Sequence, residues 1–196
     1  MVLDAPAGYA DTTFLGSPRL QEVAEALTSA SNRVLLFAIS DDDLRRFSVG
    51  DAPEMRRYMV VATPKALERE RIDAPAFARM AAEAMRGFAP LPEGADIAKA
   101  LENQPVGQAS ALAELRRDPA VLSLLHGTRL PPTRIPRLFG SEERQNFMLS
   151  SSTLMLVRGK ALSLHLYTAY QSAQDAAWVR AFTAQWVDQL QRLNAH

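Results

Sequence analysis

Serine and histidine residues near the C-terminus form the first pattern in this sequence that could support chemistry. Ser150, Ser151 and Ser152 lie in one predicted strand, and His165 lies in the next. Antiparallel pairing of these strands places Ser152 opposite His165. Such a pair can act as a nucleophile and its general base when a carboxylate orients the imidazole. No G-x-S-x-G motif surrounds the serines and both groups lie in mid-strand, so we expect a half-polar sheet face and no catalytic residue.

Three consecutive carboxylates, Asp41, Asp42 and Asp43, follow an apolar run. Carboxylates at a strand end can bind Mg²⁺ or serve an aspartate-nucleophile phosphatase. Here Leu44-Arg45 does not continue the phosphatase pattern, and no matching acidic cluster follows. Helix capping and the helix dipole account for acidic residues at a helix start. The cluster therefore predicts a helix N-terminus and no metal site.

The histidines do not predict a metal centre either. His126, His165 and His196 are far apart in sequence, and none has a histidine or carboxylate three or four residues away, as a helical zinc site would. The absence of cysteine excludes disulfides, thiol catalysis, thiolate zinc sites and iron–sulfur clusters. We therefore expect no metal and no cofactor.

The tryptophans supply a binding candidate. Trp178 and Trp186 lie two turns apart on the last predicted helix, and Trp186 falls on its apolar stripe. Trp178 lies about 100° from the line of Val179, which makes it the better candidate for an exposed aromatic at a binding surface. Packing at the edge of the core is nevertheless the commoner role for such a residue. The candidate binding residues are Trp178, Tyr167, His165 and Ser152.

The spacing of apolar residues, the helix-capping residues and the helix-breaking prolines and glycines predict the helices and strands that position these residues. Helices are expected at 18–30, 40–47, 73–88, 93–103 and 172–193. Strands are expected at 33–40, 57–63, 147–157 and 160–170. A helix-like stretch at 111–117 is the one element predicted within 105–135, where the pattern is weak.

The turn Arg158-Gly159 predicts a hairpin between the last two strands. Pairing across it gives one apolar face, made by Phe147, Leu149, Ser151, Met155, Leu162, Leu164, Leu166 and Tyr170. The other face is mixed and is expected to be half covered. The final helix carries an apolar stripe that fits the first face: Val179, Phe182, Trp186, Leu190 and Leu193.

These elements indicate one α+β domain over residues 1–196. We expect an antiparallel or mixed sheet flanked by helices, an α/β/α sandwich, in which a C-terminal β-hairpin leads into a long amphipathic helix. A doubly wound Rossmann domain is disfavoured, because helices and strands do not alternate and no glycine-rich turn follows the first strand.

The composition of the chain limits which binding partners and which cellular compartment can be expected. The 196 residues carry 22 basic and 22 acidic side chains, which gives no electrostatic reason to expect nucleic acid or an anionic membrane. No apolar run approaches the ~20 residues that span a bilayer. The first residues, Met1–Tyr9, lack the basic and apolar regions of a signal peptide. Either the protein is cytoplasmic, or it is an exported protein whose signal peptide has been replaced by Met1.

The closing segment resembles a recurring proteobacterial pattern, in which a GK-x-L-x-L strand, here Gly159–Leu164, precedes a capped helix bearing tryptophans. With the opening Ala5-Pro6-Ala7-Gly8-Tyr9, the chain looks like uncharacterised exported proteins, and its element order is similar to the PsbP-like sandwich of DcrB-like periplasmic proteins. The resemblance covers about the last fifty residues. It implies a periplasmic location and a fold that hosts binding and assembly proteins.

The sequence thus predicts a non-catalytic binding or assembly module of the bacterial cell envelope. Its partner would be an unidentified protein or small molecule, and its state a monomer or weak homodimer. Two alternatives remain open: an enzyme that uses the polar face of the C-terminal hairpin, and a cytosolic chaperone-like adaptor.

Overall fold

A computed structural model describes residues 1–92, 94–136 and 141–195, with the backbone alone described at 135–136 and 141–142. Its centre is a seven-stranded antiparallel sheet with the order β1-β2-β3-β7-β6-β5-β4. The strands are β1 (Tyr9–Asp11), β2 (Asn32–Ser40), β3 (Arg57–Pro64), β4 (Ala109–Asp118), β5 (Val121–Pro136), β6 (Ser141–Val157) and β7 (Lys160–Tyr170).

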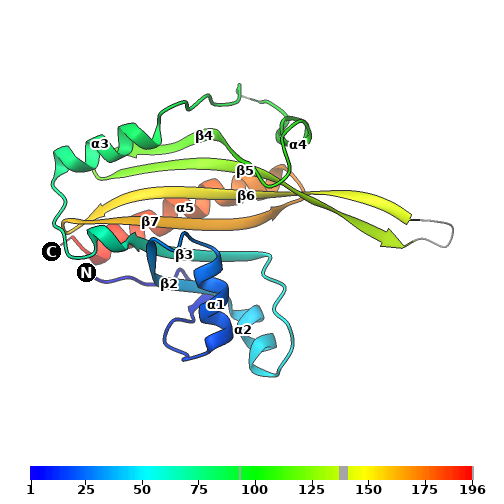
Figure 1. Ribbon diagram of the computed structural model, residues 1–196, viewed down its shortest axis with the longest axis horizontal. Helices are drawn as coiled ribbons and strands as arrows, with labels where there is room; N and C mark the ends of the chain where they lie inside the picture. The colour runs from blue at the N-terminus through cyan, green and yellow to red at the C-terminus, as the bar shows by residue number, and fades with distance from the viewer. Residues whose placement is uncertain (93, 137–140, 196) are drawn as a thin grey trace.

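Helices cover both faces of this sheet. They are α1 (Pro18–Ala26), α2 (Asp41–Ser48), the 3-10 turn η1 (Lys65–Leu67), α3 (Ala74–Ala84), α4 (Ile97–Glu102) and α5 (Ala173–Leu193). In Figure 1, α5 crosses behind the sheet, whereas α1, α2 and α3 lie in front of it. The predicted α+β class, with helices flanking a sheet and a long helix after a C-terminal hairpin, is confirmed.

The hairpin of β6 and β7 has the predicted register, with Ser152 opposite His165 and Met155 opposite Leu162. Its turn residues Arg158 and Gly159 both have positive φ, 51° and 79°, as a type I′ turn requires. This register directs Leu149, Met155, Leu162, Leu164 and Leu166 into the main core, where all five are buried. From α5, the side chains of Val179, Trp186 and Leu190 are buried against this face.

Polar groups inside this core are paired. The hydroxyl of Thr183 on α5 donates to Ser151 Oγ at 2.7 Å. Ser123 and Thr153 join β5 to β6 through a second buried hydroxyl pair at 2.8 Å. Each pair satisfies groups that would otherwise cost about 1–3 kcal/mol when buried alone. The polar positions of the strands are thus compatible with a closed interface to α5.

The predicted helix at 111–117 is wrong, because these residues belong to β4, which pairs with β5. Alanine and arginine favour a helix in isolation, but here the edge of a sheet offers them a ladder of hydrogen bonds. The unassigned segment 105–135 contributes most of β4 and β5. β5 and β6 are longer than their neighbours, and their far ends project from the sheet as a two-stranded ribbon (Figure 1).

All four helices predicted before residue 105 exist; α2 has the predicted length, and the other three are shorter. α1 ends at Ala26 and α3 at Ala84, and Phe77 is the buried residue of α3. α4 begins at Ile97; Glu93, where that helix was predicted to start, lies outside the described residues. The short strand β1 was not predicted, because three residues carry no recognisable period.

Gly127 in β5 leaves room for the buried side chains of Leu101 and Leu112. A Cβ at this position would lie 2.6 Å from Leu101 Cδ2 and 2.8 Å from Leu112 Cδ1. We predict that Gly127→Ala lowers the free energy of unfolding by about 1–3 kcal/mol, as over-packing does. Urea titration measures this, and the same substitution should cost less in a Leu101→Ala background. Equal costs in both backgrounds would contradict the steric explanation.

Candidate functional site

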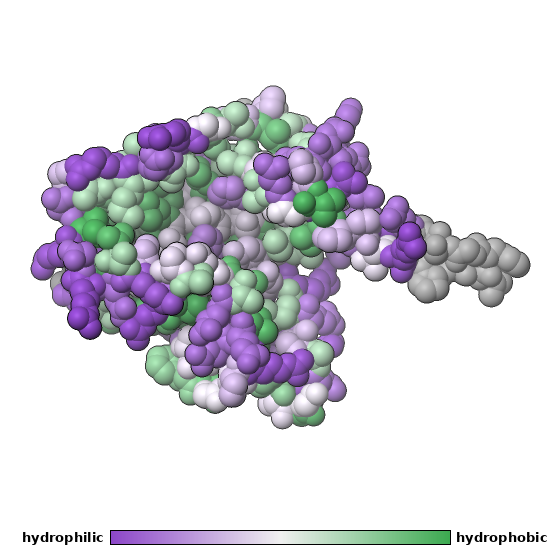
Figure 2. Space-filling view, in the orientation of Figure 1, coloured by the Kyte–Doolittle hydropathy of each residue, from purple (hydrophilic) through white to green (hydrophobic). Residues whose placement is uncertain are grey.

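Three of the four predicted binding residues meet on the front face of the sheet. Ser152 on β6 pairs with His165 on β7, and Tyr167 follows two residues along the same face. All three side chains are half-buried. In Figure 2 this part of the front face is a hollow between the margins formed by α3 and by α1 and α2.

The aromatic rings of this face form a stack. Tyr58 on β3 lies against Tyr167, with ring centroids 4.8 Å apart and planes 19° apart. His165 follows at 6.2 Å from Tyr167. The Tyr58 hydroxyl contacts Met148 Sδ at 3.8 Å. The three rings thus form a continuous stack that extends from β3 to β7.

Burial keeps this face uncharged near neutral pH. It raises the pKa of Tyr58 to about 12 and also raises that of Tyr167. It lowers the pKa of His165 to about 4, with a smaller contribution from the charge of His126. The pKa of His126 is lowered by burial as well. The two imidazoles are therefore neutral at pH 7.

The arrangement gives no support to nucleophilic catalysis by Ser152. Although Ser152 and His165 are directly opposite, their side chains make no hydrogen bond with each other within the described residues, nor does a carboxylate contact His165 there. A catalytic histidine needs both contacts, because one activates the nucleophile and the other stabilises the imidazolium. The face offers stacked rings and hydroxyls.

Trp178 lies on the opposite side of the sheet from the other three candidates. It is partly buried against the main core, and its ring stacks on Phe182 at 4.8 Å. The guanidinium of Arg57 lies 4.0 Å from the centre of the Trp178 ring and 3.4 Å from Asp175. The ring thus packs at the edge of the core, between α5 and Arg57 of β3, which is the commoner of the two roles considered for it.

The aspartate cluster stabilises a helix start, as expected. Asp43 is buried; its carboxylate accepts the backbone N–H of Glu54 at 2.7 Å and the hydroxyl of Ser40 at 2.9 Å. Asp42 forms an ion pair with Arg45. Across the part of the chain that the structure describes, no group of three histidine, aspartate or glutamate residues is arranged to hold a metal ion.

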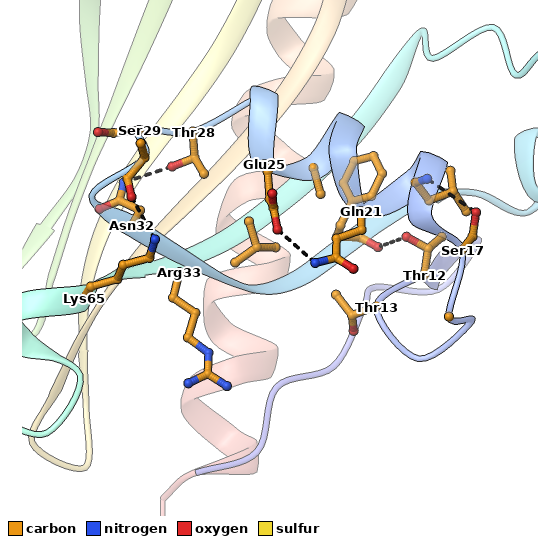
Figure 3. Close-up of a pocket in the computed structure, with 16 residues that line it drawn as sticks. Thr12, Thr13, Ser17, Gln21, Glu25, Thr28, Ser29, Asn32, Arg33 and Lys65 are labelled. Atoms are coloured by element: carbon orange, nitrogen blue, oxygen red, sulfur yellow. Dashed lines mark hydrogen bonds between the residues drawn. The ribbon is translucent and has the colours of Figure 1, made fainter.

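A pocket of about 640 Å³ lies between α1 and the outer edge of β2. α1 packs on β2 through Leu20 and Ala24, which are buried against Phe37. The loop after β1 bounds one end of the pocket, and the turn that connects α1 to β2 bounds the other (Figure 3). Its volume falls in the range of ordinary ligand pockets.

The pocket has an apolar floor and a polar rim. Leu20, Ala24, Val34 and Phe37 form the apolar part. The polar and charged lining residues are Thr12, Thr13, Ser17, Gln21, Glu25, Thr28, Ser29, Asn32, Arg33 and Lys65.

Hydrogen bonds hold several of these polar side chains in place (Figure 3). Gln21 Nε2 donates to Glu25 Oε1 at 2.9 Å, and Asn32 Nδ2 donates to Thr28 Oγ1 at 2.9 Å. Lys65 Nζ donates to the carbonyl of Ala30, also at 2.9 Å. Arg33 pairs with Glu68. A rim ordered in this way loses little conformational entropy when a ligand binds.

Sequence reasoning did not identify this pocket. Its residues come from α1, β2 and three loops, and no motif connects them. One signal was present in Thr12–Ser17, a loop that carries two large apolar residues. Phe14 and Leu15 are 89% and 52% exposed in the structure, beside the residues of the same loop that line the pocket. An exposed aromatic next to a pocket is typical of a binding surface.

Comparison with known proteins identifies no relative of this chain. A scan against family models finds no match, and searches of curated proteins and of solved structures find none either. Among the described residues, no helix combines the length and the apolar character needed to cross a bilayer. What can be inferred about the ligand site therefore comes from the fold and its surfaces.

Proposed function

We propose that this protein is a non-catalytic binding module and that its ligand site is the pocket between α1 and β2. The observation that carries this proposal is the combination of a pocket of about 640 Å³, an apolar floor and a pre-ordered polar rim. An apolar floor supplies binding free energy, and a few placed polar groups supply orientation. The expected ligand has an apolar group flanked by hydrogen-bonding atoms.

A location in the cell envelope and a monomeric or weakly dimeric state belong to the same proposal. The location is supported by the sequence resemblance to PsbP-like and DcrB-like exported proteins. In this proposal the front sheet face, with its neutral imidazoles and stacked tyrosines, belongs to the scaffold.

We predict that small organic fragments bind in this pocket and that Gln21→Trp blocks them. Gln21 lines the pocket from α1 and is exposed, so an indole there fills the space without disturbing the core. Glu22→Trp is the matched control, because Glu22 is exposed on the same helix and does not line the pocket. Backbone amide shifts in ¹⁵N–¹H spectra report binding.

Fragments should shift the amides of α1 and β2 in the wild type and in Glu22→Trp. In Gln21→Trp their affinity should fall by about tenfold or more. If no fragment binds here, or if the shifts map to other elements, the proposed function is wrong.

A further inference from the structure

We infer that the occupant of this pocket is an extended polypeptide segment of a partner protein, which adds as a strand to the outer edge of β2. The inference rests on the proposed function and specifies its ligand. It starts from a difference in length. β2 runs from Asn32 to Ser40, whereas its outer neighbour β1 pairs only with Ala38, Ile39 and Ser40.

β1 leaves the sheet for a local reason. Thr12 makes the last contacts, with its N–H and its hydroxyl both donating to the carbonyl of Phe37 at 2.8 and 2.9 Å. The carboxylate of Asp11 then accepts the N–H and the hydroxyl of Thr13. This turn directs the chain away from β2.

The outer edge of β2 is therefore open beyond Phe37. Within the described chain, Arg33, Val34 and Leu36 pair with β3 on one side, and Leu35 lies at a register shift in that pairing. No strand pairs with residues 33–36 on the other side. Backbone N–H and C=O groups on a free edge are the donors and acceptors that an added strand uses. The open stretch corresponds to about four residues, or about 13 Å of extended chain.

The pocket lies along this open stretch. Val34 and Phe37 of β2 form its floor together with α1, so a strand on the edge would direct alternate side chains under α1. Phe14 and Leu15 extend the apolar surface beyond the end of β1. Backbone pairing provides affinity and the pocket provides selectivity, as in other complexes formed by strand addition.

Charge favours a foreign segment over the same edge of a second copy. The lining carries Arg33 and Lys65 against one carboxylate, Glu25, and Lys65 forms no ion pair within the described residues. An acidic group on the guest is therefore favoured at the Lys65 end.

The test uses random linear peptides of about twelve residues displayed on phage and selected on the intact wild-type protein. Synthetic copies of the selected peptides should bind the wild type and Glu22→Trp alike, and Gln21→Trp about tenfold or more weakly.

Two further measurements test whether the peptide adds as a strand. Hydrogen exchange at the open edge of β2 should slow in the complex. N-methylation of alternate peptide residues should weaken binding about tenfold at one set of positions and be tolerated at the other.

Two results would overturn the inference. One is a set of peptides that bind Gln21→Trp as tightly as the wild type, or the selection of no peptide at all. The other is binding in the pocket without any alternation in the effect of N-methylation, which excludes an added strand. If fragments bind the pocket while peptides do not, the proposed function stands and the strand inference fails. If neither binds, both fail.

Discussion

Replacing Trp186 by alanine lowers the free energy of unfolding by about 3–5 kcal/mol, because it leaves a cavity in the main core. The indole is 2% exposed and lies between α5 and the sheet. Its Nε1–H also donates to the carbonyl of Asp4 at 3.0 Å, so the substitution releases a contact that holds the N-terminal segment on α5. Urea unfolding followed by circular dichroism measures the loss.

Trp178→Ala is the control for this result. It removes the same side chain from the same helix, but Trp178 is only partly buried, so we expect a loss of about 1–2 kcal/mol. If Trp186→Ala costs no more than Trp178→Ala, then α5 does not pack as described.

Acidification from pH 7 to pH 5 destabilises the wild type by about 2 kcal/mol through His165. The folded-state pKa of His165 is lowered to about 4, whereas an unfolded histidine titrates near 6.5. As the pH falls below 6.5, the unfolded chain binds the proton first. The stability present above pH 6.5 is therefore lost progressively down to about pH 4.

The groups around His165 do not offset this loss. Its neighbours on the sheet face are His126, whose pKa is lowered, and Tyr167, whose pKa is raised, and neither adds a negative charge in this range. His165→Gln should therefore unfold with a smaller dependence on pH between 7 and 5, and the dependence that remains comes in part from His126, which burial affects in the same direction. Urea titrations at several pH values measure both proteins, and parallel curves for the two would show that His165 is not the cause.

The C-terminal third was predictable because several local signals agree there. The Arg158-Gly159 turn sets the register, the register sets which residues face inward, and the stripe on α5 matches that face. A shift of one residue would turn Leu162 and Leu164 out of the core and Ser163 into it, so the hydrophobic pattern favours the observed pairing.

The middle of the chain was not predictable from the same signals. β4 consists of residues such as Ala111 and Arg117, whose intrinsic preference is helical, and it becomes a strand because β5 provides a partner. Pairing between strands that are distant in sequence, such as β3 and β7, is determined by the assembled sheet. No local sequence pattern predicts it.

The hairpin pattern placed Ser152 and His165 opposite each other correctly, but no motif identified the pocket. Pairing within one hairpin is a local property, and the register follows from the turn. The pocket instead depends on where β1 stops and how α1 crosses β2, which are properties of the folded chain. A binding site assembled from separate elements without a charged or glycine-rich motif is therefore not visible in one sequence.

The most direct test of the proposed ligand site is a nuclear Overhauser experiment on protein with labelled methyl groups. A bound fragment or selected peptide should show contacts to the methyl groups of Leu20, Ala24 and Val34, which line the pocket. Contacts to Leu154 or Leu156 on the front sheet face, with none to the pocket methyl groups, would contradict it.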